Sequence, residues 1–253
     1  MAGVLEVKHV YKTFVAGKTR IEAVRNVSLT IEEGEAVGLV GESGCGKSTL
    51  AKLITRLETC DSGQILLCGE DLTRLSGSAL RRAYRNLKMI FQQPRSSFDP
   101  RLSIGASIGE TLKVAGMARK ERYGEIERLL RMVGLDASYA KAKPMELSGG
   151  ECQRAAIARA IAAKPRLLIC DECTSALDVS VQAQIMDLLR QLRRHQDMSF
   201  LFISHDLALV SSFCDRVYVM KDGTIVEDGN TLQVINDPQH NYTKSLLASV
   251  LPA

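Results

Sequence analysis

Hydrophobic and polar residues follow three patterns along the chain. Apolar and polar positions alternate in LEVKHV and VSLTI, within residues 1 to 35, which is typical of strands with one buried face. Apolar residues between Gln92 and Leu147 recur at helical spacing, as in SIGASIGETLKVAG and ERYGEIERLLRMVGL. Four short and almost continuous apolar runs indicate strands buried on both faces: Ala36 to Val40, Met89 to Phe91, Leu167 to Cys170, and Phe200 to Ser204. The chain is therefore predicted to have a mainly parallel α/β core, an antiparallel edge sheet and an inserted helical segment.

These patterns divide one predicted domain, residues 1–253, into four segments. They are the edge sheet with the first part of the core (1–92), an inserted helical subdomain (93–147), the rest of the core (148–230), and a short tail (231–253). The third segment ends in a Gly-containing hairpin, VYVMKDGTIVEDG. Composition is ordinary for a globular protein, with 45% hydrophobic and 25% charged residues. Because no apolar run reaches the length of a membrane span and no signal-peptide core precedes Lys8, we expect a cytosolic chain.

The strongest local motif is GESGCGKS, between the apolar run at 36–40 and a stretch of helical spacing that begins near Thr49. Strand, glycine loop and helix in this order form a phosphate cradle, because the loop N–H groups and the helix N-terminus both favour anions. Lys47 is expected to reach the β and γ phosphates, and the Ser48 hydroxyl to ligate Mg²⁺. The predicted nucleotide contacts here are Gly41, Glu42, Ser43, Gly44, Cys45, Gly46, Lys47, Ser48 and Thr49.

Two carboxylates follow the apolar run at 167–170. Asp171 suits the role of orienting the Mg²⁺ shell, and Glu172 that of polarising an attacking water. The competing interpretation is a solvated acidic turn after a core strand. The position of the acids at the tip of a buried strand favours the catalytic one.

The stretch LSGGE at 147–151, followed by Gln153 and Arg154, resembles the signature sequence of the ATP-binding-cassette family. This resemblance implies that Ser148, Gly149 and Gly150 begin a helix whose N-terminus contacts the γ-phosphate of an ATP held by the opposite subunit. Each ATP, with its Mg²⁺, would then lie between two chains. Ser148 also fits as the N-cap of the run ECQRAAIARAIAA, and the two roles are compatible.

Further positions match the same family in chain order. Gln92 resembles the glutamine that joins the core to the helical subdomain and senses Mg²⁺ and the γ-phosphate. SALD at 175–178, which ends in Asp178, resembles the loop that crosses the dimer interface, and His205 in SHDL resembles the switch histidine. Phe14 lies where the family places an aromatic ring that stacks on adenine, with Tyr11 as the competing candidate.

Three longer stretches are similar to the ATPases of dipeptide, oligopeptide and nickel importers: SSFDPRLSIG, LDVSVQAQI and DPQHNYTKSLL. FCDRVYVM favours the nickel or metal-chelate branch. The resemblance implies a second ABC ATPase subunit of related but non-identical sequence, two membrane-spanning permease subunits and, indirectly, an extracytoplasmic solute-binding protein. It also implies a peripheral location on the cytoplasmic face of the inner membrane, and no nucleic acid.

Alternative functions share part of this motif set. An exporter or lipoprotein-release ATPase would share every catalytic motif, so only the importer-like stretches argue against it. A non-transport cassette protein usually has tandem cassettes or a long coiled-coil insertion, and neither is visible. A P-loop kinase or GTPase would leave LSGGE and His205 unexplained.

Several positions depart from the family or carry a second interpretation. Glu151 stands where glutamine is commonest, Cys173 where proline usually follows the catalytic glutamate, and Asn241 where the tail usually has proline. None of these is a phosphate or Mg²⁺ ligand, so we expect activity to survive. The Cys170/Cys173 spacing suits a metal, yet without a second pair it indicates packing residues. The basic stretch at 81–88 is interpreted as a solvated helix face, with contact to acidic lipid or nucleic acid as the alternative.

Overall fold

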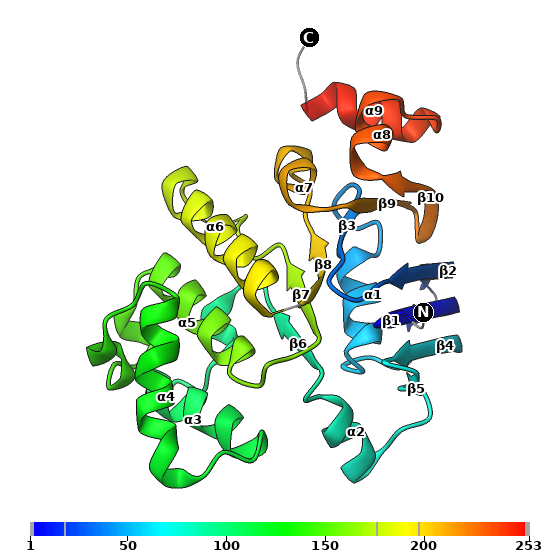
Figure 1. Ribbon diagram of the computed structural model, residues 1–253. Coiled ribbons are helices and arrows are strands. Elements are labelled where there is room, and N and C mark those ends of the chain that lie inside the picture. The colour runs from blue at the N-terminus through cyan, green and yellow to red at the C-terminus, as the bar shows by residue number, and fades with distance from the viewer. Residues whose placement is uncertain (1–2, 18, 176, 197, 251–253) are drawn as a thin grey trace.

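A computed structural model describes residues 3–17, 19–175, 177–196 and 198–250, and these residues form two sheets with helices around them (Figure 1). The antiparallel sheet has the order β2-β1-β4-β5, with β1 (Leu5–Ala16), β2 (Thr19–Ile31), β4 (Ser62–Leu67) and β5 (Glu70–Asp71). The larger sheet has the order β10-β9-β3-β8-β7-β6, with β10 (Thr224–Asn230), β9 (Arg216–Lys221), β3 (Ala36–Val40), β8 (Ser199–Ile203), β7 (Leu167–Asp171) and β6 (Leu87–Ile90). All its pairs are parallel except β9 with β10. The predicted fold class is confirmed.

The helices fall into groups that Figure 1 separates clearly. Their bounds are α1 (Lys47–Ile54), α2 (Gly77–Ala83), α3 (Ile104–Val114), α4 (Arg119–Met132), α5 (Gly149–Ile161), α6 (Val179–Gln196), α7 (Leu207–Phe213), α8 (Thr231–Asn236) and α9 (Asn241–Val250). The green helices α3, α4 and α5 lie at one side, and the antiparallel sheet lies at the other (Figure 1). The six-stranded sheet and α1 lie between these two regions.

Strand periodicity divides the core into two layers. In β8, Phe200 and Phe202 pack in the layer that contains α5, α6 and α7, whereas Leu201 and Ile203 pack with α1 and the antiparallel sheet. Successive strand residues point to opposite faces, so a strand covered on both faces has to be apolar throughout. This explains the continuous apolar runs in the sequence.

The inserted segment is fastened to the core through α5. Ile108 of α3 and Ile126 of α4 share a buried cluster with the alanines of α5. The half-buried Arg159 of α5 reaches back to the 3-10 helix Pro94–Ser97, where its Nη1 donates to the Ser97 carbonyl at 2.6 Å. Its guanidinium also lies 4.1 Å from the centre of the Phe98 ring. The inserted segment is therefore packed along α5.

The C-terminal segment folds back onto the core. β9 and β10 form the predicted hairpin, and its turn residues Asp222 and Gly223 have φ angles of 46° and 82°, as a tight hairpin turn requires. α8 and α9 follow, and Tyr242 and Leu247 of α9 are buried against the larger sheet's helical layer. Within the described part of the chain, no helix combines the length and apolarity needed to cross a bilayer.

Candidate functional site

The glycine loop between β3 and α1 is shaped by close backbone neighbours. Gly41 and Gly46 have φ angles of 150° and 111°, which residues with a side chain rarely adopt. A Cβ on Gly41 would lie 2.1 Å from the Met220 carbonyl oxygen, and one on Gly46 would lie 2.2 Å from that of Ala23. The hairpin strand β9 and the edge strand β2 therefore press on the loop from outside and set its curvature.

The N-terminus of α1 is open to an anion. Its N-cap is Gly46, which offers no side chain to the first N–H groups, and the first turn has no acidic residue. Gly44 has a φ of 84° and faces open space, so backbone can approach a ligand there. The Lys47 side chain is buried, and its Nζ donates to the carbonyls of Gly41 and Glu42 at 2.8 Å each. The geometry fits the predicted phosphate cradle.

A hydroxyl and a carboxylate meet where the sequence predicts the metal. Ser48 Oγ donates to Asp171 Oδ1 at 3.1 Å, from α1 to the end of β7. Only 7% of Asp171 is exposed, and this burial raises its pKa, although the Ser48 hydrogen bond opposes the shift. Oxygen donors of these two kinds, beside a phosphate cradle, are what Mg²⁺ prefers, and a cation would supply the buried carboxylate's counter-charge.

Glu172 is held in a strained backbone conformation between two predicted partners. Its φ is 45°, an uncommon value for a residue with a side chain, and its N–H donates to the Ile203 carbonyl at 2.9 Å. Gln92 Nε2 donates to Glu172 Oε2 at 2.8 Å, and His205 Nδ1 lies 3.6 Å from Glu172 Oε1. The carboxylate at the tip of β7 is thus oriented by Gln92, with the His205 ring near its other oxygen.

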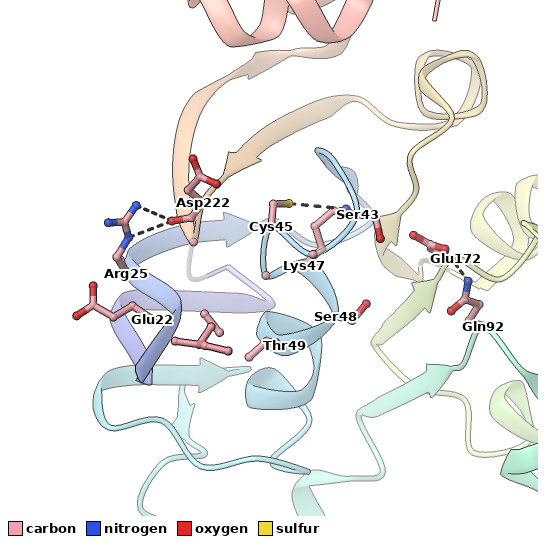
Figure 2. A pocket seen from close by; sticks show the side chains of 15 residues that line it. Glu22, Arg25, Ser43, Cys45, Lys47, Ser48, Thr49, Gln92, Glu172 and Asp222 are labelled. Carbon is pink, nitrogen blue, oxygen red and sulfur yellow. Dashed lines mark hydrogen bonds between the residues drawn. The ribbon is translucent and has the colours of Figure 1, made fainter. Parts of the chain in front are cut away.

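These groups line an open cavity of about 530 Å³. Figure 2 shows Ser48 pointing from α1 toward Glu172 and Gln92. The lining residues are Ile21, Glu22, Ala23, Arg25, Ser43, Gly44, Cys45, Gly46, Lys47, Ser48, Thr49, Gln92, Glu172, Asp222 and Gly223. The cavity brings together seven of the nine predicted loop contacts, Ser43 to Thr49, whereas Gly41 and Glu42 are not among its lining residues. Asp171 and His205 do not line the cavity themselves. Asp171 contacts the lining residue Ser48, and His205 lies beside the lining residue Glu172.

Sequence reasoning missed one wall of this cavity, formed by β2 and the hairpin turn. Arg25 Nε and Nη2 donate to the Asp222 carbonyl at 3.0 and 2.6 Å (Figure 2). The Gly223 N–H donates to the Cys45 carbonyl at 2.9 Å. The hairpin turn therefore ties β2 to the glycine loop. The Asp-Gly pair was a visible turn signal, but its distant partners were not.

Phe14 is not among the residues that line the cavity. It lies on β1 opposite Ile21 of β2, which does line the cavity, and 37% of its surface is exposed. Lys12 Nζ lies 5.1 Å from the centre of its ring. Tyr11, the competing candidate, pairs with Ser62 of β4. Of the two candidates, Phe14 is the one paired with a residue that lines the cavity.

The residues of LSGGE lie away from this cavity, at the start of α5. The Ser148 hydroxyl accepts from the Glu151 N–H at 3.3 Å, and Glu151 Oε2 accepts from the Ser148 N–H at 2.7 Å, which completes a capping box. The Tyr139 hydroxyl donates to the other carboxylate oxygen of Glu151, and this hydrogen bond lowers the pKa of Glu151. Glutamate at a position where the family usually has glutamine thus keeps the cap.

The start of α5 also touches the start of α6. A Cβ on Gly150 would lie 2.7 Å from Val181 Cγ1, so glycine permits this approach, and Gly149 lies beside Leu177. Asp178 Oδ1 accepts from the Val181 N–H at 3.0 Å and from the Ser180 hydroxyl at 2.7 Å. Ala176, in the SALD loop, lies outside the described residues. The two predicted interface segments are therefore neighbours on one side of the chain.

The other two departures from the family pattern are Cys173 and Asn241. Cys173 is buried, as is Cys170, and both are free thiols. Asn241 is the first residue of α9. Neither lies among the cavity-lining residues.

Comparisons with known proteins agree with this geometry. The profile of the ABC transporter family matches residues 24–175. The chain is 44% identical over 252 residues to the dipeptide transport ATP-binding protein DppF of Lactococcus lactis, covering 98% of this chain and 81% of that protein. It is 41% identical over 247 residues to the oligopeptide transport ATP-binding protein OppF of Haemophilus influenzae, covering 97% and 74%.

A solved structure is similar over nearly its whole length. It is an ATP-binding cassette in a dimeric, post-hydrolysis state bound to ADP and Pi, with a TM-score of 0.80 and 31% identity. The match covers 90% of this chain and 98% of the solved one. With the family profile, the relatives and the site geometry in agreement, the chain belongs to the ABC transporter family and is an ATPase that uses ATP with Mg²⁺.

Proposed function

We propose that this chain hydrolyses ATP with Glu172 as the base and thereby powers a peptide importer. The main support is the position of the Glu172 carboxylate, which lies at the cavity edge and accepts a hydrogen bond from Gln92 at 2.8 Å. A water oxygen attacks the γ-phosphorus, the bond to the β-phosphate oxygen breaks, and the water proton passes to the carboxylate. His205, 3.6 Å from the other Glu172 oxygen, steadies that carboxylate.

The remaining site residues bind and orient the nucleotide. The N–H groups of the loop from Gly41 to Thr49 cradle the phosphates, and Lys47 turns from its two carbonyl partners to the β and γ phosphates. Ser48, Gln92 and Asp171 are proposed to hold Mg²⁺, which neutralises phosphate charge when bound. Phe14 is proposed to stack on adenine beside the wall formed by β2.

A complete site needs two chains in this proposal. Ser148, Gly149 and Gly150 lie outside the cavity that holds Lys47, at the start of α5, which supports a contact with another chain's ATP. Asp178 lies on the same side as Gly150, through their shared neighbour Val181. ATP bridging favours the closed dimer, and hydrolysis removes the bridging contacts so that the chains separate.

The partners follow from this cycle and from the relatives. We infer a second, related but non-identical ATPase chain, two membrane-spanning permease subunits, and indirect dependence on an extracytoplasmic binding protein. The chain would sit on the cytoplasmic face of the membrane. α3 and α4, which share a buried core with α5, are suited to carry the closure into a permease subunit.

Peptides are the proposed cargo because both relatives described above are named for peptide transport, and neither name mentions nickel. The test is the ATPase rate of the complete transporter in vesicles with its co-encoded binding protein. We expect di- or oligopeptide-loaded binding protein to raise the rate several-fold over the unloaded one. Stimulation by a nickel chelate but by no peptide would contradict the cargo, and solute efflux would contradict import.

A further inference from the structure

The C-terminal helix reaches the phosphate loop from 200 residues further along the chain. The Glu42 N–H donates to the hydroxyl of Tyr242, the second residue of α9, at 3.0 Å. Only 8% of Tyr242 is exposed. Burial also raises the pKa of Tyr242, so the hydroxyl stays protonated at physiological pH. A residue of the tail is therefore part of the loop's support.

The position of Tyr242 is itself fixed by its surroundings. Its N–H donates to His240 Nδ1 at 3.1 Å, and Lys221 Nζ lies 4.9 Å from the centre of its ring. The N–H groups of Gln239 and His240 donate to the Glu227 carboxylate at 2.7 and 3.0 Å. Because Glu227 belongs to β10, the start of α9 is anchored to the larger sheet.

Glu42 is held at both ends of its backbone. Its N–H is bonded to Tyr242, and its carbonyl accepts from Lys47 Nζ at 2.8 Å. When Lys47 turns to the phosphates, the Glu42 carbonyl keeps only its 3.3 Å hydrogen bond from the Cys45 N–H. The hydrogen bond from the Glu42 N–H to the Tyr242 hydroxyl then keeps the first turn of the loop in place.

We propose that Tyr242 is a positioning residue for the phosphate loop, through which α9 sets the affinity of this site for ATP. The inference rests on the proposed role of Lys47. It implies that a ligand or partner subunit that shifts α9 changes ATP affinity without touching the cavity.

The test compares two tyrosine-to-phenylalanine variants that each lose one hydroxyl. Tyr242→Phe keeps the ring and its packing but loses the bond to Glu42. Because one neutral hydrogen bond is lost, we expect the KM for ATP and the Kd from a titration to rise about three- to tenfold, with kcat within about twofold. The control is Tyr84→Phe, which removes a 3.0 Å bond from a tyrosine hydroxyl to the Thr55 carbonyl at the far end of α1. The control should leave both KM and kcat unchanged.

A second variant tests the anchoring of the helix. Glu227→Gln leaves one acceptor oxygen for two N–H donors, so the start of α9 loosens. We expect a smaller rise in KM in the same direction, about twofold. An unchanged KM in Tyr242→Phe, or an equal rise in Tyr84→Phe, would overturn the inference. Lys47→Ala separates the two possible failures once the Tyr242→Phe result has gone against the inference. Normal ATP binding by Lys47→Ala would show that the proposed function fails as well, whereas lost ATP binding would show that only the role of Tyr242 fails.

Discussion

Two helices of this chain begin at a proposed γ-phosphate contact, and they begin differently. α1 starts after Gly46, with no capping side chain. α5 starts after Ser148, whose hydroxyl and N–H are both bonded to Glu151 in a capping box. The chain thus leaves one helix end open and closes the other with its own side chains.

The difference corresponds to when each end meets its phosphate. The open end of α1 belongs to the cavity that also contains Glu172, so its N–H groups are available to a nucleotide bound by the same chain. The start of α5 meets a phosphate only when another chain delivers it. Until then its N–H groups need partners of their own, which Ser148 and Glu151 provide. Changes at α1 should therefore affect binding, and changes at α5 should affect closure and turnover.

The largest effect is expected at the open end. Lys47→Ala removes the cation proposed for the β and γ phosphates, and should weaken ATP binding about 100-fold because charge-assisted bonds are lost. Isothermal titration of the single chain measures this directly. ATP affinity within twofold of the unchanged protein would contradict the role of Lys47.

A smaller effect is expected at the capped end, and of a different kind. Ser148→Ala should leave the ATP affinity of the single chain unchanged, because Ser148 lies outside the cavity. Turnover of the complete transporter should fall about tenfold through loss of the cap and of a phosphate contact. Phosphate release at saturating ATP is the measurement.

Glu151→Gln is the matched control for that variant, because an amide oxygen preserves one acceptor of the capping box. Its turnover should stay within about twofold. Weaker ATP binding by the isolated Ser148→Ala chain would contradict the proposed division, in which α1 affects binding and α5 affects turnover.

Sequence patterns predicted the core well where the controlling contacts are local. The run at 36–40 became β3 with the expected bounds, because five fully buried residues and a glycine loop specify a strand end without help from elsewhere. The hairpin was likewise marked by its own Asp-Gly turn. Local sequence also placed Glu172 at the tip of β7.

What could not be predicted depends on contacts between distant segments. β4 joins the antiparallel sheet by pairing with β1, which lies far away in the chain, and β5 then pairs with β4. The cavity wall from β2 and the hydrogen bond from Glu42 to Tyr242 also join separate segments. The pairing of Phe14 with the cavity-lining Ile21 also joins two strands, and it depends on the register of β1 against β2. A one-residue change in that register would move Phe14 to the other face, and sequence alternation alone does not fix it.

The central claim, a site shared by two chains with Glu172 as its base, is tested most directly with Glu172→Gln and the co-purified partner ATPase. The amide keeps the shape of the side chain and removes the base, so ATP should bind and remain uncleaved. Analytical ultracentrifugation with ATP should give a stable dimer that separates with ADP, while phosphate release falls about 100-fold or more. Separate chains at saturating ATP, or normal phosphate release, would contradict the account.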